Sequence, residues 1–108
     1  MLNNLVIVGR LTADPELKES ESGKKVTYIT VAVPRSYKNV DGEYEVDLID
    51  CVLWLGMAET IMHHCKKGDL VGVKGRVQTR IENDIKVQEL IAEKITVLSS
   101  QKDDEQQN

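Results

Sequence analysis

The sequence predicts an all-β domain with a single helix. Five segments either alternate between apolar and polar residues or run almost continuously apolar, which is typical of strands. One further segment, residues 57–67, has the pattern of a short helix, and Gly68 follows it as a stop signal. Groups of Asp, Asn, Gly and Pro separate the segments, as expected of turns. The predicted order is therefore three strands, one helix and two strands.

The three strands before the helix are predicted at residues 4–11, 25–34 and 47–55. The first is almost continuously apolar, which predicts cover on both faces, by the core on one side and by a second subunit on the other. The second and third alternate, so successive side chains point to opposite faces. One face of the second strand consists of Thr27, Ile29, Val31 and Val33, and the predicted core face of the third consists of Ile49, Cys51, Leu53 and Leu55.

The fourth predicted strand, residues 71–80, carries the clearest charge pattern in the chain. Like-side residues in a strand lie about 6.6 Å apart, so a row of cations here can follow a phosphate chain. An ordinary solvated face would have the same pattern. Two glycines in the segment predict a bend, a bulge or close backbone approach. The glycines are Gly72 and Gly75, the predicted core face is Val71, Val73, Val77 and Thr79, and the polar face is Lys74, Arg76, Gln78 and Arg80.

The fifth predicted strand, residues 85–98, follows a tight polar turn. Three strands, a helix and two strands is the order of the OB-fold, a five-stranded, partly open Greek-key barrel that binds oligonucleotides and oligosaccharides. Other small barrels remain open on the pattern alone. Residues 1–98 are predicted to form one domain, and the polar residues 99–108 a disordered tail. One side of the fifth strand is expected to consist of Val87, Glu89, Ile91, Glu93, Ile95 and Val97.

Composition narrows the functional classes. The net charge of −4 argues mildly against a nucleic-acid binder, but many acids fall in predicted loops and in the tail, whereas the strands carry many of the cations. No apolar run approaches the roughly 20 residues that span a bilayer, and no signal-peptide pattern is present, so a cytoplasmic protein without membrane contact is predicted. Cys51 and Cys65 are then expected to be free thiols, because that compartment is reducing.

Catalytic and metal-binding patterns are not recognisable in the sequence. His63 and His64 are adjacent in the predicted helix, so they cannot both face one site. Together with Cys65 they suggest a metal only weakly, because a closed zinc site needs four ligands. The sequence therefore predicts neither an enzyme nor a bound cofactor or metal.

The aromatic residues give the positive functional signal. Trp54 lies on the face of the third strand opposite the predicted core face, where it is either half-buried under a loop or a platform for a nucleobase. Base stacking on such a platform contributes about 1–3 kcal/mol per base and tolerates any sequence. Tyr37 lies close to cations in a polar loop, whereas Tyr28 and Tyr44 are interpreted as structural.

Several blocks of the chain resemble the bacterial single-stranded-DNA-binding protein family over residues 1–98. The most specific are GRLTADPEL and KKGDLVGVKGRVQTR, and they stand in the correct order with SGKKVTYITVAVPRSYKN and DLIDCVLWLGMAE. The resemblance implies an OB-fold protomer in a homotetramer, with a dimer as the alternative. It also implies binding of single-stranded DNA without sequence preference in replication, repair, recombination or DNA uptake, at the nucleoid.

Carried over by position, the resemblance implies base stacking on Tyr37 and Trp54. A third family aromatic position holds Leu48, and a fourth falls on Ile81 or Glu82 in the short final hairpin, so weaker or more salt-sensitive binding is expected. Asp50 adds a negative charge to the same face. The implied phosphate contacts are Arg10, Lys67, Arg76 and Arg80, with Arg35 and Lys38 beside Tyr37 and Lys74 from the cationic row.

Two further expectations concern partners. Family members generally end in an acidic tip that closes in an apolar pair and recruits enzymes, whereas this chain ends DDEQQN, so recruitment through such a tip is not expected. The alternative function is a protein-interaction module on the same fold, resembling the primosomal replication protein, with DNA contact secondary. An exposed Tyr37 and Trp54 in a basic groove would favour DNA binding, and a buried Trp54 in an acidic groove would favour the module.

Overall fold

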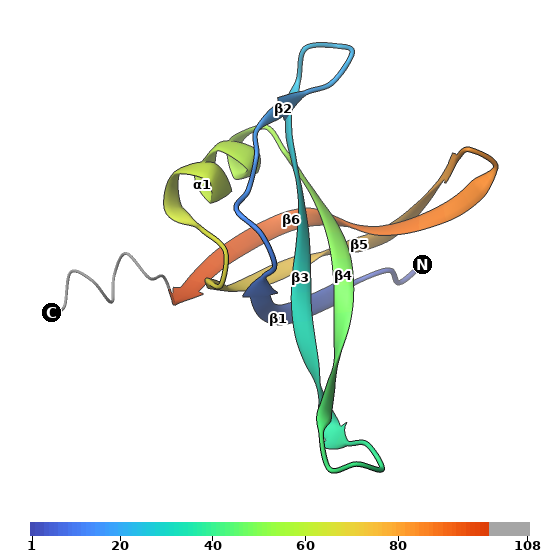
Figure 1. Ribbon diagram of the computed structural model, residues 1–108. Helices are drawn as coiled ribbons and strands as arrows, with labels where there is room; N and C mark the ends of the chain where they lie inside the picture. The colour runs from blue at the N-terminus through green and yellow to red at the C-terminus, as the bar shows by residue number, and fades with distance from the viewer. Residues whose placement is uncertain (100–108) are drawn as a thin grey trace, which may run out of the picture.

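One continuous sheet closes on itself to form a barrel, because its first strand pairs with two different neighbours (Figure 1). The computed structural model describes residues 1–99. The strand order is β1-β5-β6-β4-β3-β2, and the additional β1–β3 pairing closes the barrel, which confirms the OB-fold. The elements are β1 (Leu5–Leu11), β2 (Lys18–Glu19), β3 (Lys25–Lys38), β4 (Tyr44–Trp54), α1 (Gly56–His64), β5 (Leu70–Glu82) and β6 (Ile85–Ser99).

The core lies inside the barrel, where the alternation of β3 and β4 places it. Val31 and Leu53 are fully buried, and Ile61 of α1 closes the same cluster from one end. The predicted core face of β4 is thus confirmed, except that Leu55 is exposed and precedes α1 with a positive φ of 57°. The helix ends at His64, three residues before the predicted end.

The outer face of β1 is open in the single chain. Ile7 and Leu11 point into the core, whereas Val6 and Val8 are exposed, Val6 to 66%. The chain itself therefore covers only one face of this apolar strand.

Gly75 makes the close backbone approach that the sequence predicts. A Cβ atom added there would collide with the Ile91 carbonyl oxygen, whereas one added at Gly72 would meet only ordinary van der Waals contacts. The barrel bend therefore depends on Gly75. Gly9 also lies too close to a neighbouring strand for a side chain, because an added Cβ would collide with the Ala32 carbonyl oxygen where β1 pairs with β3.

The predicted single face of β6 is wrong, because a β-bulge reverses its alternation. Lys74 pairs with Lys94 and the adjacent Gly75 pairs with Ala92, so Glu93 is the extra residue. One inserted residue moves every later side chain to the opposite face. Leu90, Ala92, Ile95 and Val97 consequently pack in or against the core, and Val87, Glu89 and Ile91 do not.

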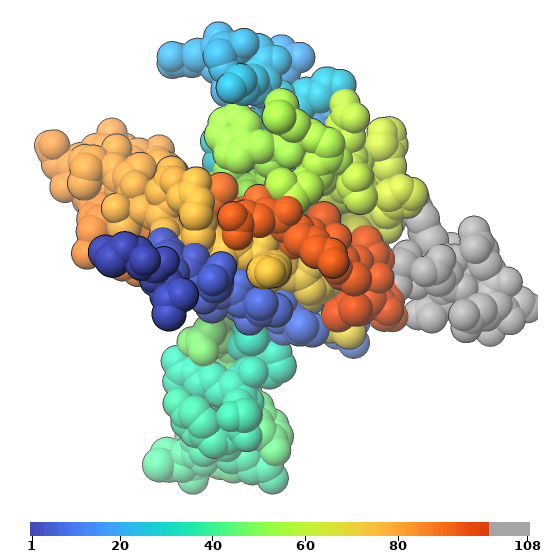
Figure 2. All heavy atoms as spheres, turned by 180° about the vertical axis from the view of Figure 1, so that it is seen from behind, coloured from blue at the N-terminus to red at the C-terminus, as the bar shows by residue number. Residues whose placement is uncertain are grey.

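Two strand pairs extend beyond the barrel. Figure 2 shows the far end of the β3–β4 ribbon projecting from one side and the loop after β2 from the other. The β5–β6 hairpin also extends outward, and it turns through Asn83 and Asp84, which both have positive φ. Val77 and Thr79 are therefore exposed, which corrects their predicted place in the core face.

The remaining expectations for the fold concern the helix, the cysteines and the tail. Within residues 1–99, no helix is long and apolar enough to cross a membrane. Cys51 and Cys65 are buried and form no disulfide within residues 1–99, and burial is the main cause that raises the pKa of Cys51 to about 12. The predicted tail lies outside the described residues apart from Ser99, which ends β6.

Candidate nucleic-acid interface

Trp54 ends β4 on the outer surface of the barrel, beside an open groove. The groove has a volume of about 740 Å³, and the loop after β2 forms its other wall through Ser20, Glu21, Ser22 and Lys24. The loop holds its shape through a Ser20–Ser22 hydroxyl contact of 3.0 Å and a positive φ at Gly23. Trp54 is half-buried, so it has an open side toward the groove while its other side packs on the sheet.

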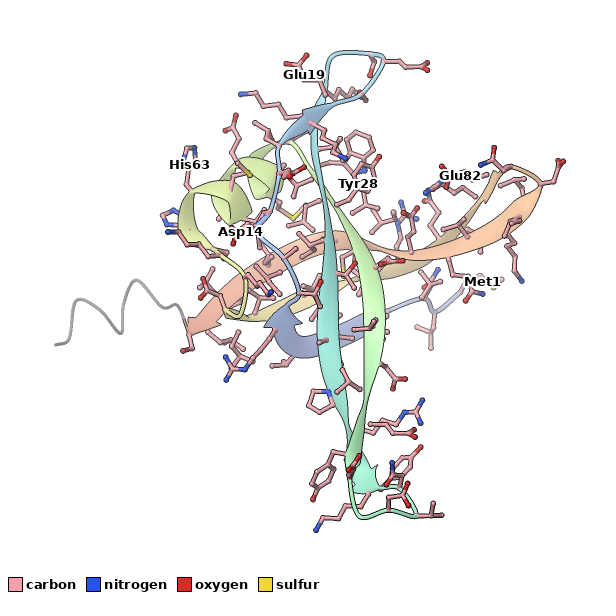
Figure 3. All side chains as sticks on the ribbon, viewed as in Figure 1. Met1, Asp14, Glu19, Tyr28, His63 and Glu82 are labelled. Atoms are coloured by element: carbon pink, nitrogen blue, oxygen red, sulfur yellow. The ribbon has the colours of Figure 1, made fainter. Side chains whose placement is uncertain are left out.

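Tyr28 belongs to the same outer surface, although the sequence analysis interpreted it as structural. Its side chain is 50% exposed, and Figure 3 shows it projecting outward from β3, away from α1. Tyr28 pairs with Val52, the second residue before Trp54, so the two aromatics are diagonal neighbours. The Lys18 Nζ lies 5.9 Å from the Tyr28 ring centroid. The signal available in the sequence was its alternation with the buried Thr27 and Ile29.

A row of paired residues crosses four strands from Tyr28 to the cationic strand, with Val52 buried and Ile91 and Arg76 half-buried. Tyr28 pairs with Val52, Val52 pairs with Ile91, and Ile91 pairs with Arg76. The guanidinium of Arg76 donates to Gln78 Oε1 at 2.6 Å. The strand register therefore places an aromatic platform and a cation at the two ends of one row, with the buried Val52 between them.

Tyr37 lies in β3 and not in the predicted loop, at the other end of the β3–β4 ribbon from Trp54. Trp54 and Tyr44 are ten residues apart along β4, which corresponds to about 33 Å. Tyr37 is 64% exposed, and in the same region the Lys38 Nζ lies 5.7 Å from the Tyr44 ring centroid. The two predicted platforms are thus both accessible but do not share one local groove.

Two of the predicted cations are held by carboxylates. Arg35 Nη2 lies 2.9 Å from Asp47 Oδ1, and this hydrogen bond is the main cause that raises the pKa of Arg35 and lowers the pKa of Asp47. Arg80 Nε lies 2.8 Å from Glu89 Oε1, and Glu82 is its second partner at 3.0 Å. A phosphate must compete with these carboxylates for either arginine.

The other predicted cations have no ion pair within residues 1–99. Arg10 Nη1 donates to the Gly68 carbonyl oxygen at 2.9 Å, and the Lys67 backbone N–H donates to Asp14 Oδ1 at 2.8 Å. Lys74 faces Lys94 across the β5–β6 pair, beside the exposed β1 strand. The members of this group, which we call the unpaired cations, are Arg10, Lys38, Lys67, Lys74 and Arg76.

No aromatic side chain occupies the positions where the resemblance implied further stacking aromatics. Leu48 is exposed on the outer face of β4, and Ile81 and Glu82, the two candidates for the other position, are exposed near the tip of the β5–β6 hairpin. In the part of the chain that the structure describes, no three His, Cys, Asp or Glu side chains lie close enough to hold a metal ion. The site therefore consists of aromatic platforms and cations on the outside of the barrel.

An OB barrel with aromatic and cationic side chains on an open sheet face defines the class of oligonucleotide-binding proteins. The sequence model of the single-strand binding protein family matches residues 2–99, and the chain belongs to this family. The family consists of DNA-binding proteins, not enzymes.

Curated relatives support this assignment. The single-stranded DNA-binding protein B of Bacillus subtilis is 50% identical over 80 residues, which cover 74% of this chain and 71% of that protein. The single-stranded DNA-binding protein 3 of Streptococcus agalactiae is 44% identical over 113 residues, covering all of this chain and 82% of that protein. A single-stranded DNA-binding protein of Enterococcus faecalis is 44% identical over 98% of this chain and 59% of its own length.

Proposed function

We propose that the chain binds single-stranded DNA without sequence preference by stacking bases on Trp54 and Tyr37. The observation that carries this proposal is the position of Trp54, half-buried on the sheet but open to a groove. A flat side chain fixed in this way can stack on a base at little cost in conformational entropy. The proposed setting is replication, repair, recombination or DNA uptake, in the cytoplasm at the nucleoid.

The unpaired cations supply most of the proposed phosphate contacts. Their side chains form no ion pair with a carboxylate within residues 1–99, so they can neutralise phosphates without first breaking one. Arg35 and Arg80 remain proposed contacts of smaller effect, because a phosphate gains less where an arginine is already paired. The affinity should fall with salt as counterions compete for the phosphates.

We further propose that the protomers assemble, as a homotetramer or a dimer, through the outer face of β1. Val6, Val8 and Leu98 are exposed there and line one shallow depression together with Lys74. Assembly through this face would place Lys74 at the interface, where it could not contact DNA in the same way. The cationic row of β5 would then divide between two roles, with Arg76 on the DNA side.

The second candidate function is a protein-interaction module. It is favoured by Leu48 and Ile81, which leave two positions without an aromatic, and by Glu21 in the groove beside Trp54. Lys24 lines the same groove, so the groove is neither basic nor acidic. From the sequence, a basic groove is expected for DNA binding and an acidic groove for the interaction module. A groove of mixed charge does not distinguish the two functions, so a binding measurement has to decide.

Trp54 fluorescence during titration with a long thymidine homopolymer provides this measurement. Trp54 is the only tryptophan, so the signal has a single source. Strong quenching that weakens at higher salt is the expected result. A folded protein without quenching at low salt would support the interaction module instead.

Replacement of Trp54 by Ala tests the platform itself. We expect the affinity for the homopolymer to fall by at least about 1 kcal/mol, because one base loses its stacking partner. Trp54→Phe keeps a smaller ring and should retain most of the affinity. Fluorescence anisotropy of a labelled oligonucleotide measures both variants, and an unchanged affinity in folded Trp54→Ala would remove Trp54 from the site.

A further inference from the structure

Leu55 breaks two local rules at once, between the end of β4 and the start of α1. It has φ 57° and ψ −124°. These angles are close to the values of about +60° and −120° at the first central residue of a type II′ turn, a position that is usually glycine. Leu55 is also the N-cap residue of α1, where leucine cannot supply the side-chain hydrogen bond that Ser, Thr, Asp or Asn would. Leucine is therefore unfavourable here for two independent reasons.

Neighbouring elements hold the backbone of Leu55 in this conformation. Its N–H donates to the Lys25 carbonyl oxygen of β3 at 2.8 Å, and its carbonyl oxygen accepts from the Glu59 N–H of α1 at 3.2 Å. The side chains of Lys25 and Glu59 are joined by an ion pair, whose hydrogen bond is the main cause that raises the pKa of Lys25 and lowers the pKa of Glu59. Because both backbone groups of Leu55 are fixed, its strain persists in the folded chain.

The fold gains little from the leucine side chain itself. Leu55 is 55% exposed, and the side chains of residues 1–99 that pack in or against the core include Met57 and Ile61 of α1 but not Leu55. Gly56 follows directly, without a positive φ and with open space where a Cβ atom would lie. A glycine thus stands one residue away from the position that favours one. Backbone shape alone would be better served by glycine at position 55.

The side chain of Leu55 lines the groove beside Trp54. We propose that Leu55 contacts the DNA, as an apolar wall of this groove against which the nucleotide stacked on Trp54 packs. Apolar contact is not directional, so it accepts any sugar or base face and agrees with binding without sequence preference. The inference rests on the proposed DNA binding, to which it adds a contact residue that the backbone holds in place at a cost in stability.

Leu55→Gly tests the proposal, because the leucine should have opposite effects on binding and on stability. Loss of the side chain should weaken binding of the thymidine homopolymer about fivefold, as expected when roughly half of a leucine side chain no longer becomes buried. Glycine also removes the backbone strain and is accepted at an N-cap, so the midpoint of urea unfolding should not fall. Fluorescence anisotropy measures the affinity, and urea unfolding at one protein concentration measures the stability.

Leu55→Met is the matched control, because it keeps an apolar side chain of similar volume at the same backbone position and should bind within about twofold of the unaltered protein. Unchanged affinity in Leu55→Gly would overturn the inference, and so would a lowered urea midpoint, which would mean that the side chain supports the fold. Equal weakening by both substitutions would also overturn it. Trp54 quenching by the homopolymer would then leave the proposed function standing, whereas no quenching in the folded, unaltered protein would overturn both.

Discussion

At the scale of single residues, Tyr28 extends the aromatic surface beyond what the sequence analysis assigned. We expect Tyr28→Leu to weaken homopolymer binding by about 1 kcal/mol, because half of this side chain is open beside Trp54. Tyr28→Phe keeps the ring and removes only the hydroxyl, so it should bind nearly as well as the original. If Tyr28→Leu and Tyr28→Phe bound the homopolymer equally in an anisotropy titration, the Tyr28 ring would not stack on a base and its role would be structural.

Arg76 and Arg80 form a matched pair on one strand, since only Arg80 is held by carboxylates. Arg76→Gln should lower the slope of log affinity against log salt by about 0.7, the value for one phosphate contact on a single strand. Arg80→Gln should lower it less. Titrations at four salt concentrations measure both slopes, and equal slopes for the two variants would contradict the distinction between paired and unpaired cations.

The residue-scale predictions from sequence succeeded where alternation alone decides orientation. The outward position of Trp54 and the buried position of Leu53 follow directly from the period of a strand. The ion pairs of Arg35 with Asp47 and of Arg80 with Glu89 did not follow, because these partners lie on neighbouring strands. Such contacts depend on strand register, which the composition of one segment does not contain.

At the scale of elements, the bend of β5 depends on one glycine and not on its neighbour. Gly75→Ala should lower the free energy of unfolding by about 1–3 kcal/mol, because its Cβ atom would collide with the Ile91 carbonyl oxygen. Gly72→Ala meets only ordinary contacts and should change it by less than about 1 kcal/mol. Urea unfolding at one protein concentration compares them, and equal losses would contradict this account of the bend.

The sequence predicted all five long strands and the helix, but not the bulge of β6. Its side chains alternate without interruption from Val87 to Val97, and nothing in that pattern indicates that Glu93 is extra. The bulge arises where β6 passes Gly75 of β5, so its cause lies in a contact between two strands. To predict a bulge of this kind, one must know the partner strand and its register as well as the segment itself.

At the scale of the whole molecule, the open face of β1 is expected to govern assembly. Val8→Asp should shift the protein toward monomers, because it places a charge in the exposed apolar face of β1. Val40→Asp is the control, since Val40 is fully exposed in the turn of the β3–β4 ribbon. Light scattering at micromolar concentration gives the masses, and a stable monomer of the unaltered chain would contradict the proposed assembly.

The separation of Trp54 and Tyr37 makes the β3–β4 ribbon a molecular ruler. Trp54 and Tyr44, which pairs with the Lys38 next to Tyr37, are about 33 Å apart along β4. At the 3.4 Å spacing of a B-form strand this length corresponds to about ten nucleotides, and to fewer if the strand is stretched. A shorter oligonucleotide can occupy only one platform, whereas a longer one is held at both ends, and its second contact forms at a high effective concentration. Affinity should then rise in a step with oligonucleotide length, so the chain would discriminate between short gaps and long single-stranded tracts by reach alone.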